Sequence, residues 1–213
     1  MKQRTRQQIL LALVIVVVLA LLYKRFYQVS GPPHPRPEPG LIGCGVHCGT
    51  ERWAVKTLSD AGAASVNFTA TPVTVDWLVS QPLPAGLPED ARISPIEDQA
   101  YVVTARLVGF KLEDDEDIHI VIADLNNPAE TMIVEIPSTD CSGVCSSAHI
   151  AEISTARAQF ETRFGAPHKK FERVPGDVTV TVTGIGFFDF LHHQTGVAPN
   201  GIEIHPVLSV VAQ

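Results

Sequence analysis

The stretch DIHIVIADLNNPAETMIVEI, residues 117–136, contains two strand patterns separated by a turn. Its first half alternates isoleucine with other residues, and Asn126-Asn127-Pro128 then supplies a turn sequence. Its second half alternates again, up to Ile136. A period of two residues is typical of a strand that buries one face. The stretch therefore predicts two successive strands, at 117–124 and 131–136.

The flanking sequence extends this pair to a larger sheet. Ala100 to Leu112 predicts a long preceding strand, and Ser146 to Phe164 has helical spacing. Two more strands are predicted after the helix, Asp177 to Phe190 and Ile202 to Val210. Three strands, a helix and two strands follow one another in a five-stranded OB-fold barrel. The predicted fold class is therefore mainly β, an OB-fold-like domain over residues 99–213, and a mixed sandwich of the same elements is the alternative.

Residues 41–98 are predicted to form an N-terminal extension that packs on the barrel. Within the extension, Thr71 and Pro72 predict the N-cap and first helical position of a short helix that continues to Gln81. The β-branched residues of the same segment leave a strand open as the alternative.

The N-terminal sequence predicts a single transmembrane helix. A basic segment, residues 1–8, precedes an apolar run that forms an anchor over residues 9–29 if Lys24 and Arg25 extend toward the lipid headgroups. No small-x-small cleavage triplet follows Leu22, so an uncleaved anchor is favoured over a secretory signal. The excess of positive charge places residues 1–8 in the cytoplasm. The domain is then expected on the extracytoplasmic, periplasmic side of the inner membrane.

Residues 30–40, SGPPHPRPEPG, predict a stiff linker that holds the domain away from the membrane. The sequence after the linker, Leu41-Ile42-Gly43-Cys44, is similar to a lipoprotein acylation signal. Such a signal should directly follow the apolar run, whereas the linker intervenes here. Lipidation of Cys44 is therefore only an alternative.

The four cysteines form two Cys-x-x-x-Cys pairs, Cys44 with Cys48 and Cys141 with Cys145. In an exported domain we expect disulfides, and bridges between the two pairs would close the longer loop and stabilise more. A zinc site of four thiolates is the alternative, although zinc knuckles usually have two residues between their cysteines.

The charge of the chain is unevenly distributed. The formal net charge is −7, but residues 1–30 hold five of the sixteen basic residues and no acidic residue. The remainder has 11 basic and 23 acidic residues, a formal charge of −12. An acidic domain repels phosphate backbones, which argues against a nucleic-acid partner.

The polar residues of the predicted barrel indicate a ligand site. In OB-folds, the loop between the first two strands and the loop between the last two frame the binding face. Here these loops are Glu113–Glu116 and Leu191–Asn200. If the isoleucines of the strands point inward, the residues between them point outward. The candidate ligand-binding residues are Asp117, His119, Glu135, His192, His193, Glu203 and His205. Four of them form an Asp-x-His and a Glu-x-His pattern that suits a divalent metal ion or an acid/base pair, namely Asp117, His119, Glu203 and His205.

Three segments resemble a family of uncharacterised exported bacterial proteins, and the most specific is GFFDFLHHQTGVAPNGIEIHPVL, residues 186–208. The others are ERWAVKTLSD, residues 51–60, and LVGFKLEDDEDIHIVIADL, residues 107–125. The resemblance spans residues 48–211 and implies export and a single domain, with no activity or catalytic residue to transfer. The strand order is also similar to that of staphylococcal-nuclease-like domains, but their Asp/Arg/Glu cluster has no match here, so nuclease activity is not implied.

Together these patterns predict a membrane-anchored extracytoplasmic binding or interaction module, with a protein or saccharide of the cell envelope as its partner. The four acidic residues of the Glu113–Glu116 loop favour cationic, metal-bridged or neutral saccharide ligands. The alternative is a metal-dependent hydrolase that uses Asp117, His119, Glu203 and His205. No serine or cysteine lies in a recognisable nucleophile motif.

Overall fold

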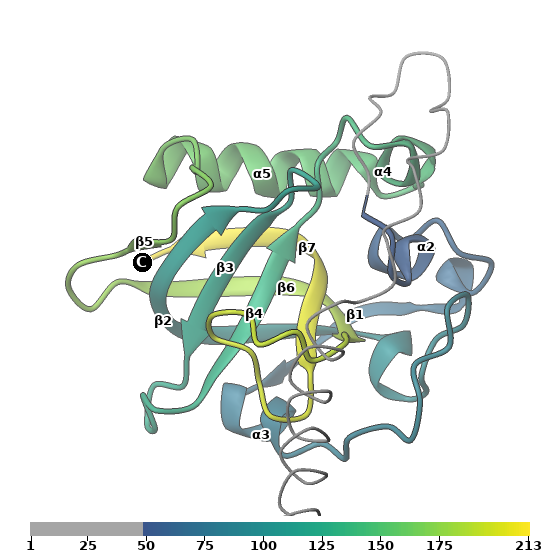
Figure 1. The fold of residues 1–213 in the computed structure, drawn as a ribbon, viewed down its shortest axis with the longest axis horizontal. Coiled ribbons are helices and arrows are strands. Elements are labelled where there is room, and N and C mark those ends of the chain that lie inside the picture. The colour runs from purple at the N-terminus through teal and green to yellow at the C-terminus, as the bar shows by residue number, and fades with distance from the viewer. Residues whose placement is uncertain (1–48) are drawn as a thin grey trace, which may run out of the picture. The chain divides into compact units, whose positions relative to one another are not determined.

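Five strands close into a barrel in the part of the chain that the computed structural model describes, residues 49–213 (Figure 1). The barrel strands are β2 (Gln99–Leu112), β3 (Ile118–Ala123), β4 (Thr131–Ile136), β6 (Thr179–Phe188) and β7 (Ile202–Ala212). Their order is β2-β3-β4-β7-β6, and an antiparallel pairing of β6 with β2 closes the ring. All other neighbours are antiparallel except β4 and β7, which are parallel.

The barrel confirms the predicted core of the fold. A helix, α5 (Ile150–Phe164), lies between the third and fourth barrel strands as expected. The long strand β2 serves both sides of the barrel, pairing with β6 through residues 100–106 and with β3 through residues 106–112. The helix predicted over Ser146 to Phe164 begins four residues later, at Ile150, and Ser146 is the last residue of a separate short helix, α4 (Ser142–Ser146).

The interior of the barrel is formed by the alternating apolar residues. Ile118, Ile120 and Ile122 of β3 belong to one continuous buried core with residues of every other barrel strand. Helix α5 covers one end of this core through Phe160, whose ring meets the ring of Phe110 edge-on at a centroid distance of 5.0 Å. Figure 1 shows α5 lying across the strands at this end.

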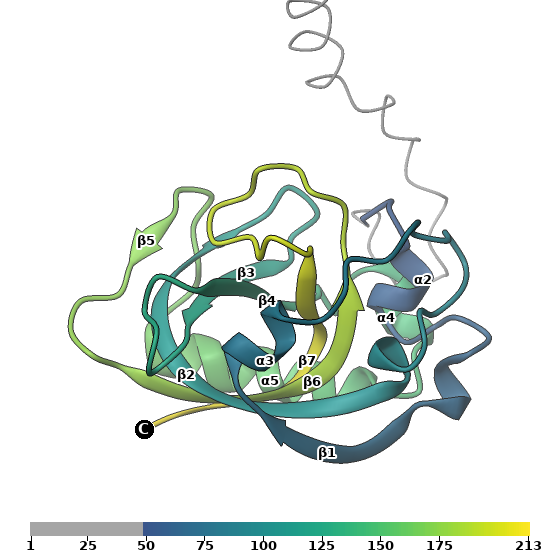
Figure 2. The same cartoon turned by 90° about the horizontal axis from the view of Figure 1, so that it is seen from below.

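Several small elements precede the barrel and pack on it. They are α2 (Trp53–Lys56), η1 (Ala63–Ser65), β1 (Asn67–Val73), α3 (Val75–Val79) and η2 (Ile96–Asp98). Strand β1 pairs in parallel with β2 at the edge of the sheet, and α3 buries Val75 and Leu78 in the barrel core. Figure 2 shows β1 running along the outside of β2.

The helix predicted to begin at Pro72 begins later. Pro72 lies in β1, and Thr74 is the N-cap of α3, where its hydroxyl accepts a hydrogen bond from the backbone N–H of Trp77 at 3.0 Å. Proline is tolerated in β1 because the strand is at an edge and need not donate to a second neighbour. A two-residue strand, β5 (Glu172–Arg173), completes the fold by pairing with β2.

Four predicted segments lie outside the described residues, namely the basic segment 1–8, the anchor 9–29, the linker 30–40 and residues 41–48 of the extension. Among residues 49–213, no helix is both long enough and apolar enough to cross a bilayer. Cys44 and Cys48 also lie outside the described range, and no disulfide joins two cysteines within it. The bridges between the two cysteine pairs therefore stay a prediction.

Candidate functional site

The polar candidates from the barrel strands lie together on the outer face of β3, β4 and β7. His119 and Glu135 are directly opposite each other in the β3–β4 ladder, and Glu203 is opposite Ile133 in the β4–β7 ladder. The alternation that sends the isoleucines inward places these residues on the other face, as expected. The face is covered, however: His119 is 0 % exposed, and Glu203 and His205 are each 1 % exposed.

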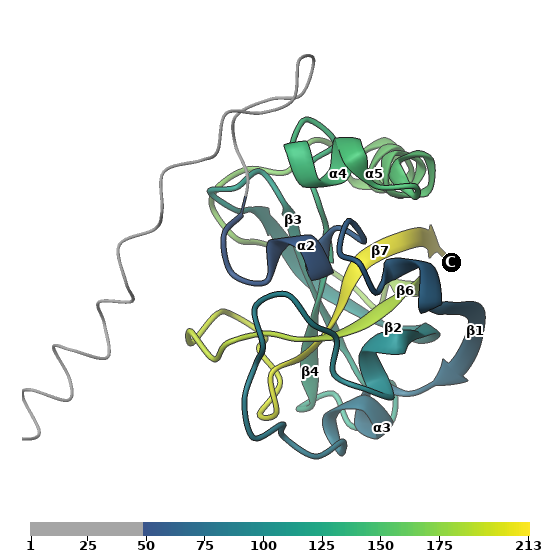
Figure 3. The ribbon, with the colours of Figure 1, turned by 90° about the vertical axis from the view of Figure 1, so that its right-hand side faces the viewer.

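The cover over this face comes from two segments remote in sequence. The loop between β6 and β7 lies over β3, where the carbonyl of Thr195 accepts a hydrogen bond from His119 Nε2 at 2.9 Å. From the N-terminal side, Lys56 of α2 forms an ion pair of 2.8 Å with Asp189 at the start of the same loop. Figures 2 and 3 show this loop and α2 beside the barrel strands. The acidic and imidazole side chains are consequently removed from bulk water.

His119 is held by hydrogen bonds at both ring nitrogens. Its Nδ1 lies 2.9 Å from Glu135 Oε1, and its Nε2 faces the Thr195 carbonyl, which can only accept. Burial alone would lower the pKa of His119, but the hydrogen bond and charge of Glu135 outweigh it and raise the pKa. Because the Thr195 carbonyl and the Glu135 carboxylate are both acceptors, a ring with a proton on each nitrogen satisfies both contacts.

His205 has the opposite character. Its Nδ1 lies 3.4 Å from Glu135 Oε2 and its Nε2 lies 3.5 Å from Asp117 Oδ2. Neither nitrogen makes a hydrogen bond within residues 49–213. Burial lowers the pKa of His205 to about 4, which keeps the ring neutral at physiological pH. On its other side, the ring meets Phe187 edge-on at a centroid distance of 5.7 Å.

The carboxylates around His205 are each anchored by one oxygen only. Asp117 Oδ1 accepts the backbone N–H of Ser138 at 2.9 Å, and Glu135 Oε1 accepts from His119. Asp117 Oδ2 and Glu203 Oε2 have no hydrogen-bond partner in the described part of the chain. Burial and the charge of Glu135 raise the pKa of both Asp117 and Glu203 well above the usual range. Burial likewise raises the pKa of the neighbouring Asp115 to about 7.

The seven sequence candidates divide into an exposed pair and a group of five on the covered face, here called the buried group, in which only Glu135 is not fully buried, with its side chain 12 % exposed. Potential ligand atoms lie within 4.8 Å of one another in two described sets, Glu113/His119/Glu135 and Asp117/Glu135/His205. Glu135 belongs to both sets. The four residues expected to share one metal centre are therefore distributed differently, because His119 and His205 lie on opposite sides of Glu135 and Glu203 is in neither set.

The two loop histidines are separate from the buried group. His192 and His193 are exposed, and His192 Nε2 lies 2.7 Å from Glu51 Oε2. In the acidic loop, Glu116 lies 3.3 Å from Lys169, and Glu113 lies 2.7 Å from Lys111. Glu113 Oε1 also lies 3.2 Å from His119 Nδ1, so the acidic loop and the β6–β7 loop both reach His119, whereas His192 pairs with Glu51.

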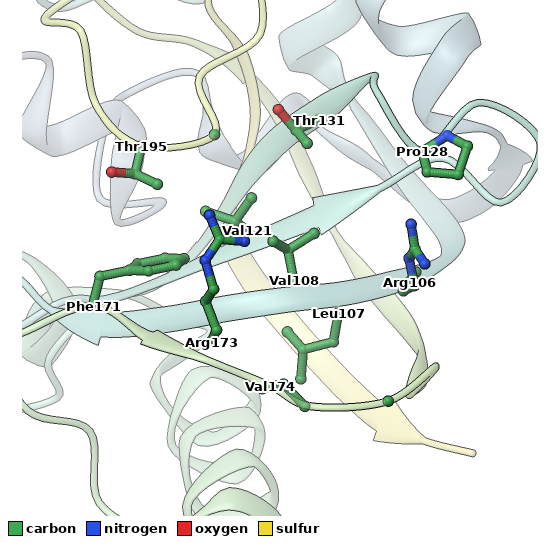
Figure 4. A pocket seen from close by; sticks show the side chains of 12 residues that line it. Arg106, Leu107, Val108, Val121, Pro128, Thr131, Phe171, Arg173, Val174 and Thr195 are labelled. Atoms are coloured by element: carbon green, nitrogen blue, oxygen red, sulfur yellow. The ribbon is translucent and has the colours of Figure 1, made fainter.

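A pocket that the sequence did not predict lies next to the buried group, on the outer face of β2 and β3 (Figure 4). Its volume is about 480 Å³. The lining comes from β2, β3, the β5 region and the β6–β7 loop, and consists of Arg106, Leu107, Val108, Val121, Pro128, Thr131, Phe171, Arg173, Val174, Gly176, Thr195 and Gly196. In Figure 4 the side chain of Arg173 stands between Phe171 and Val121, with Arg106 toward the other end.

The pocket depends on close approach of the loop to the sheet. Gly196 has φ 85°, and a Cβ at that position would lie 2.4 Å from Val121 Cγ1, so only glycine fits. Only the glycine itself was visible in the sequence as a signal for this contact. The two arginines come from strands that meet only in the folded sheet, where Arg173 pairs with Gly109 of β2.

Comparison of the chain with family models, with curated proteins and with solved structures finds no match in any of the three. The resemblance to exported bacterial proteins therefore stays a prediction, and the geometry of the buried group and of the pocket is what bears on function.

Proposed function

We propose that this protein is a membrane-anchored binding module that holds a small acidic saccharide in the pocket on the outer face of β2 and β3. The observation that carries the proposal is the pocket itself, an accessible volume of about 480 Å³ with two arginines in its lining. This volume is within the usual range of small-molecule sites. A binding role needs no accessible acid or base.

The strand order supports the same location. A five-stranded barrel with a helix between its third and fourth strands has the order of an OB-fold, in which the second and third strands and the flanking loops bind oligosaccharides or oligonucleotides. In this chain the second barrel strand is β3, and the loop before the last strand forms one wall of the pocket. The formal charge of −12 outside residues 1–30 disfavours a nucleic acid, which carries a phosphate at every nucleotide, whereas the carboxylate of a small saccharide would meet the positive charge of Arg173 in the pocket.

The chemistry of the lining favours a carboxylate-bearing sugar. Arg173 is exposed, and a guanidinium presents a planar set of donors that matches a carboxylate. The ring of Phe171, which lines the pocket, offers apolar surface to the face of a sugar ring. The acidic loop, which had favoured cationic or neutral ligands, faces Lys111 and Lys169 instead.

The hydrolase alternative is less well supported by the geometry. A general base must come within about 2.6–3.2 Å of the proton that it abstracts, directly or through one water. Asp117 and His119 are each 0 % exposed, and His205 is 1 % exposed. A substrate in the pocket could reach these groups only if the β6–β7 loop moved away.

The cellular location is proposed from the sequence of residues 1–40. We place residues 9–29 in the inner membrane and the barrel on the periplasmic side. Membrane fractionation followed by protease treatment of spheroplasts tests this placement. We expect the full-length chain in the membrane fraction and the barrel accessible to protease. A shortened soluble product, or a barrel protected in intact spheroplasts, would contradict it.

Calorimetric titration of the full-length chain in detergent tests the ligand class. The probes are a glucuronic-acid oligosaccharide and a neutral glucose oligosaccharide of the same length. We expect binding of the acidic probe only, and at least tenfold weaker binding by R173Q. The matched control is R163Q, which makes the same change on α5, away from the pocket. Equal binding of both probes, no binding of either, or an R173Q chain that binds like the original would overturn the proposal.

A further inference from the structure

The geometry points to a second site on the covered face of β3, β4 and β7, a site for one Zn²⁺ ion formed by Asp117, Glu135 and His205. One atom of each residue lies within 4.8 Å of one atom of each of the others. Imidazole nitrogen and carboxylate oxygen are both ligands that zinc takes in proteins, and the imidazole disfavours Mg²⁺ and Ca²⁺. The site goes beyond the proposed saccharide binding and does not depend on it.

The polar atoms of Asp117, Glu135 and His205 that are not used in other hydrogen bonds face one another. Asp117 uses Oδ1 for the Ser138 backbone and leaves Oδ2 without a partner among the described residues. Glu135 uses Oε1 for His119, and its Oε2 faces His205. His205 is 1 % exposed, and both of its ring nitrogens lack a hydrogen bond within residues 49–213. Buried polar atoms without a partner are costly, so atoms grouped in this way indicate a missing ligand.

The separations within the group are longer than hydrogen bonds. His205 Nε2 lies 3.5 Å from Asp117 Oδ2, and His205 Nδ1 lies 3.4 Å from Glu135 Oε2. Charge-assisted hydrogen bonds are shorter, about 2.7–2.9 Å. A zinc ion would take one of the two ring nitrogens together with one oxygen of each carboxylate, and such a set of atoms lies within 4.8 Å of one another.

His119 is excluded as a ligand by its own hydrogen bonds. A histidine must offer a nitrogen without a proton to bind a metal. His119 Nε2 lies 2.9 Å from the Thr195 carbonyl oxygen and its Nδ1 lies 2.9 Å from Glu135 Oε1, so both nitrogens are already engaged in hydrogen bonds. His119 instead orients Glu135, which is the usual role of a group behind a metal ligand.

The position of the site implies a structural role. Asp117 precedes β3, Glu135 lies in β4 and His205 lies in β7, so one ion would fasten together three strands, including the parallel β4–β7 pair that completes the barrel. Asp117 and His205 are buried and the Glu135 side chain is only 12 % exposed, so a bound ion would lie out of reach of a substrate, as a structural role requires.

Metal binding by the full-length chain in detergent tests the inference. After dialysis against EDTA, we expect uptake of one Zn²⁺ per chain and a rise in melting temperature with Zn²⁺ concentration. Ca²⁺ should not compete, because it takes oxygen ligands and not imidazole. D117N and H205Q should bind Zn²⁺ at least tenfold more weakly, whereas H192Q, which changes an exposed histidine outside the group, should bind like the original.

The absorption spectrum of the Co²⁺-loaded original chain separates this site from the cysteines and requires no variant to fold. A site of carboxylates and imidazole gives d–d bands without a sulfur-to-cobalt charge-transfer band. Such a band would assign the ion to Cys44, Cys48, Cys141 or Cys145 and overturn the inference. It is equally overturned if the original chain takes up no Zn²⁺, or if folded H205Q and D117N chains retain its affinity.

Discussion

At the scale of single residues, one buried ion pair ties the N-terminal extension to the barrel. Arg52 and Glu97 are fully buried, and two guanidinium nitrogens lie 2.6 and 2.7 Å from the two carboxylate oxygens. Arg52 also donates to the carbonyl of Phe188 at 2.6 Å, and Glu97 accepts the Phe188 backbone N–H at 2.8 Å. The end of β6 is thus hydrogen-bonded to both members of the pair.

E97Q should lower the free energy of unfolding by about 3–5 kcal/mol, because it leaves the Arg52 guanidinium buried without its counter-charge. Urea unfolding followed by circular dichroism measures the change. D177N is the control, since Asp177 is 89 % exposed in its ion pair with Arg106 and such pairs contribute about 0–1 kcal/mol. An E97Q chain within about 1 kcal/mol of the original would contradict the expectation.

At the scale of elements, Asp124 joins the end of β3 to the start of α3. Its Oδ1 accepts the backbone N–H groups of Asn126 and Asn127 at 2.8 and 3.2 Å, which fixes the turn into β4. Its Oδ2 accepts the backbone N–H of Asp76 at 3.1 Å. Burial raises the pKa of Asp124, but these hydrogen bonds outweigh it and lower the pKa below its usual value.

The pKa shift of Asp124 predicts a pH dependence of stability. A carboxyl whose pKa is lower in the folded state stabilises the fold above its unfolded pKa of about 3.9, and loses this contribution as the pH falls through the folded value. The cost of D124N should therefore be constant above about pH 5 and shrink below about pH 4. Urea titrations at several pH values check this, with D140N, an exposed aspartate of another turn, as control. A cost of D124N that grows on acidification would refute it.

At the scale of the whole molecule, the barrel is stabilised by one continuous core that α5 closes at one end. Phe160 is 0 % exposed and contacts two other rings, Phe110 at 5.0 Å and Phe164 at 4.9 Å between centroids. The outer face of β3, β4 and β7 differs from this core because it carries polar side chains. These side chains are covered by α2 and the β6–β7 loop.

F160A should lower the free energy of unfolding by about 3–5 kcal/mol, because the cavity would lie between the barrel and its helix. Guanidinium unfolding should show a lower midpoint and an unchanged slope. The control is F68A on β1, where the ring is 38 % exposed and its loss should cost less than about 1 kcal/mol. Similar costs for the two variants would show that α5 does not close the core.

Much of the barrel could be predicted because apolar residues recur at every second position within each strand. The alternating pattern predicted both ends of β4, Thr131 and Ile136, correctly. The start of the following helix was predicted too early, at Ser146, because Ser146 belongs to the separate helix α4. The helix near Pro72 was placed too early because a proline that fits a first helical turn also fits an edge strand. Whether Pro72 begins a helix or lies in a strand depends on the pairing with β2, and the residues around Pro72 do not reveal this neighbour.

The sequence by itself determined the strand order, the inward face of the isoleucines and the outward face of Asp117, His119, Glu135, Glu203 and His205, because side chains alternate along a strand whatever surrounds it. Only the tertiary structure decided that this outer face is buried, that Glu135 stands between two histidines, and that Arg106 and Arg173 meet at one pocket. Those outcomes arise from contacts between segments distant in the chain, such as Lys56 with Asp189, and no local period encodes them.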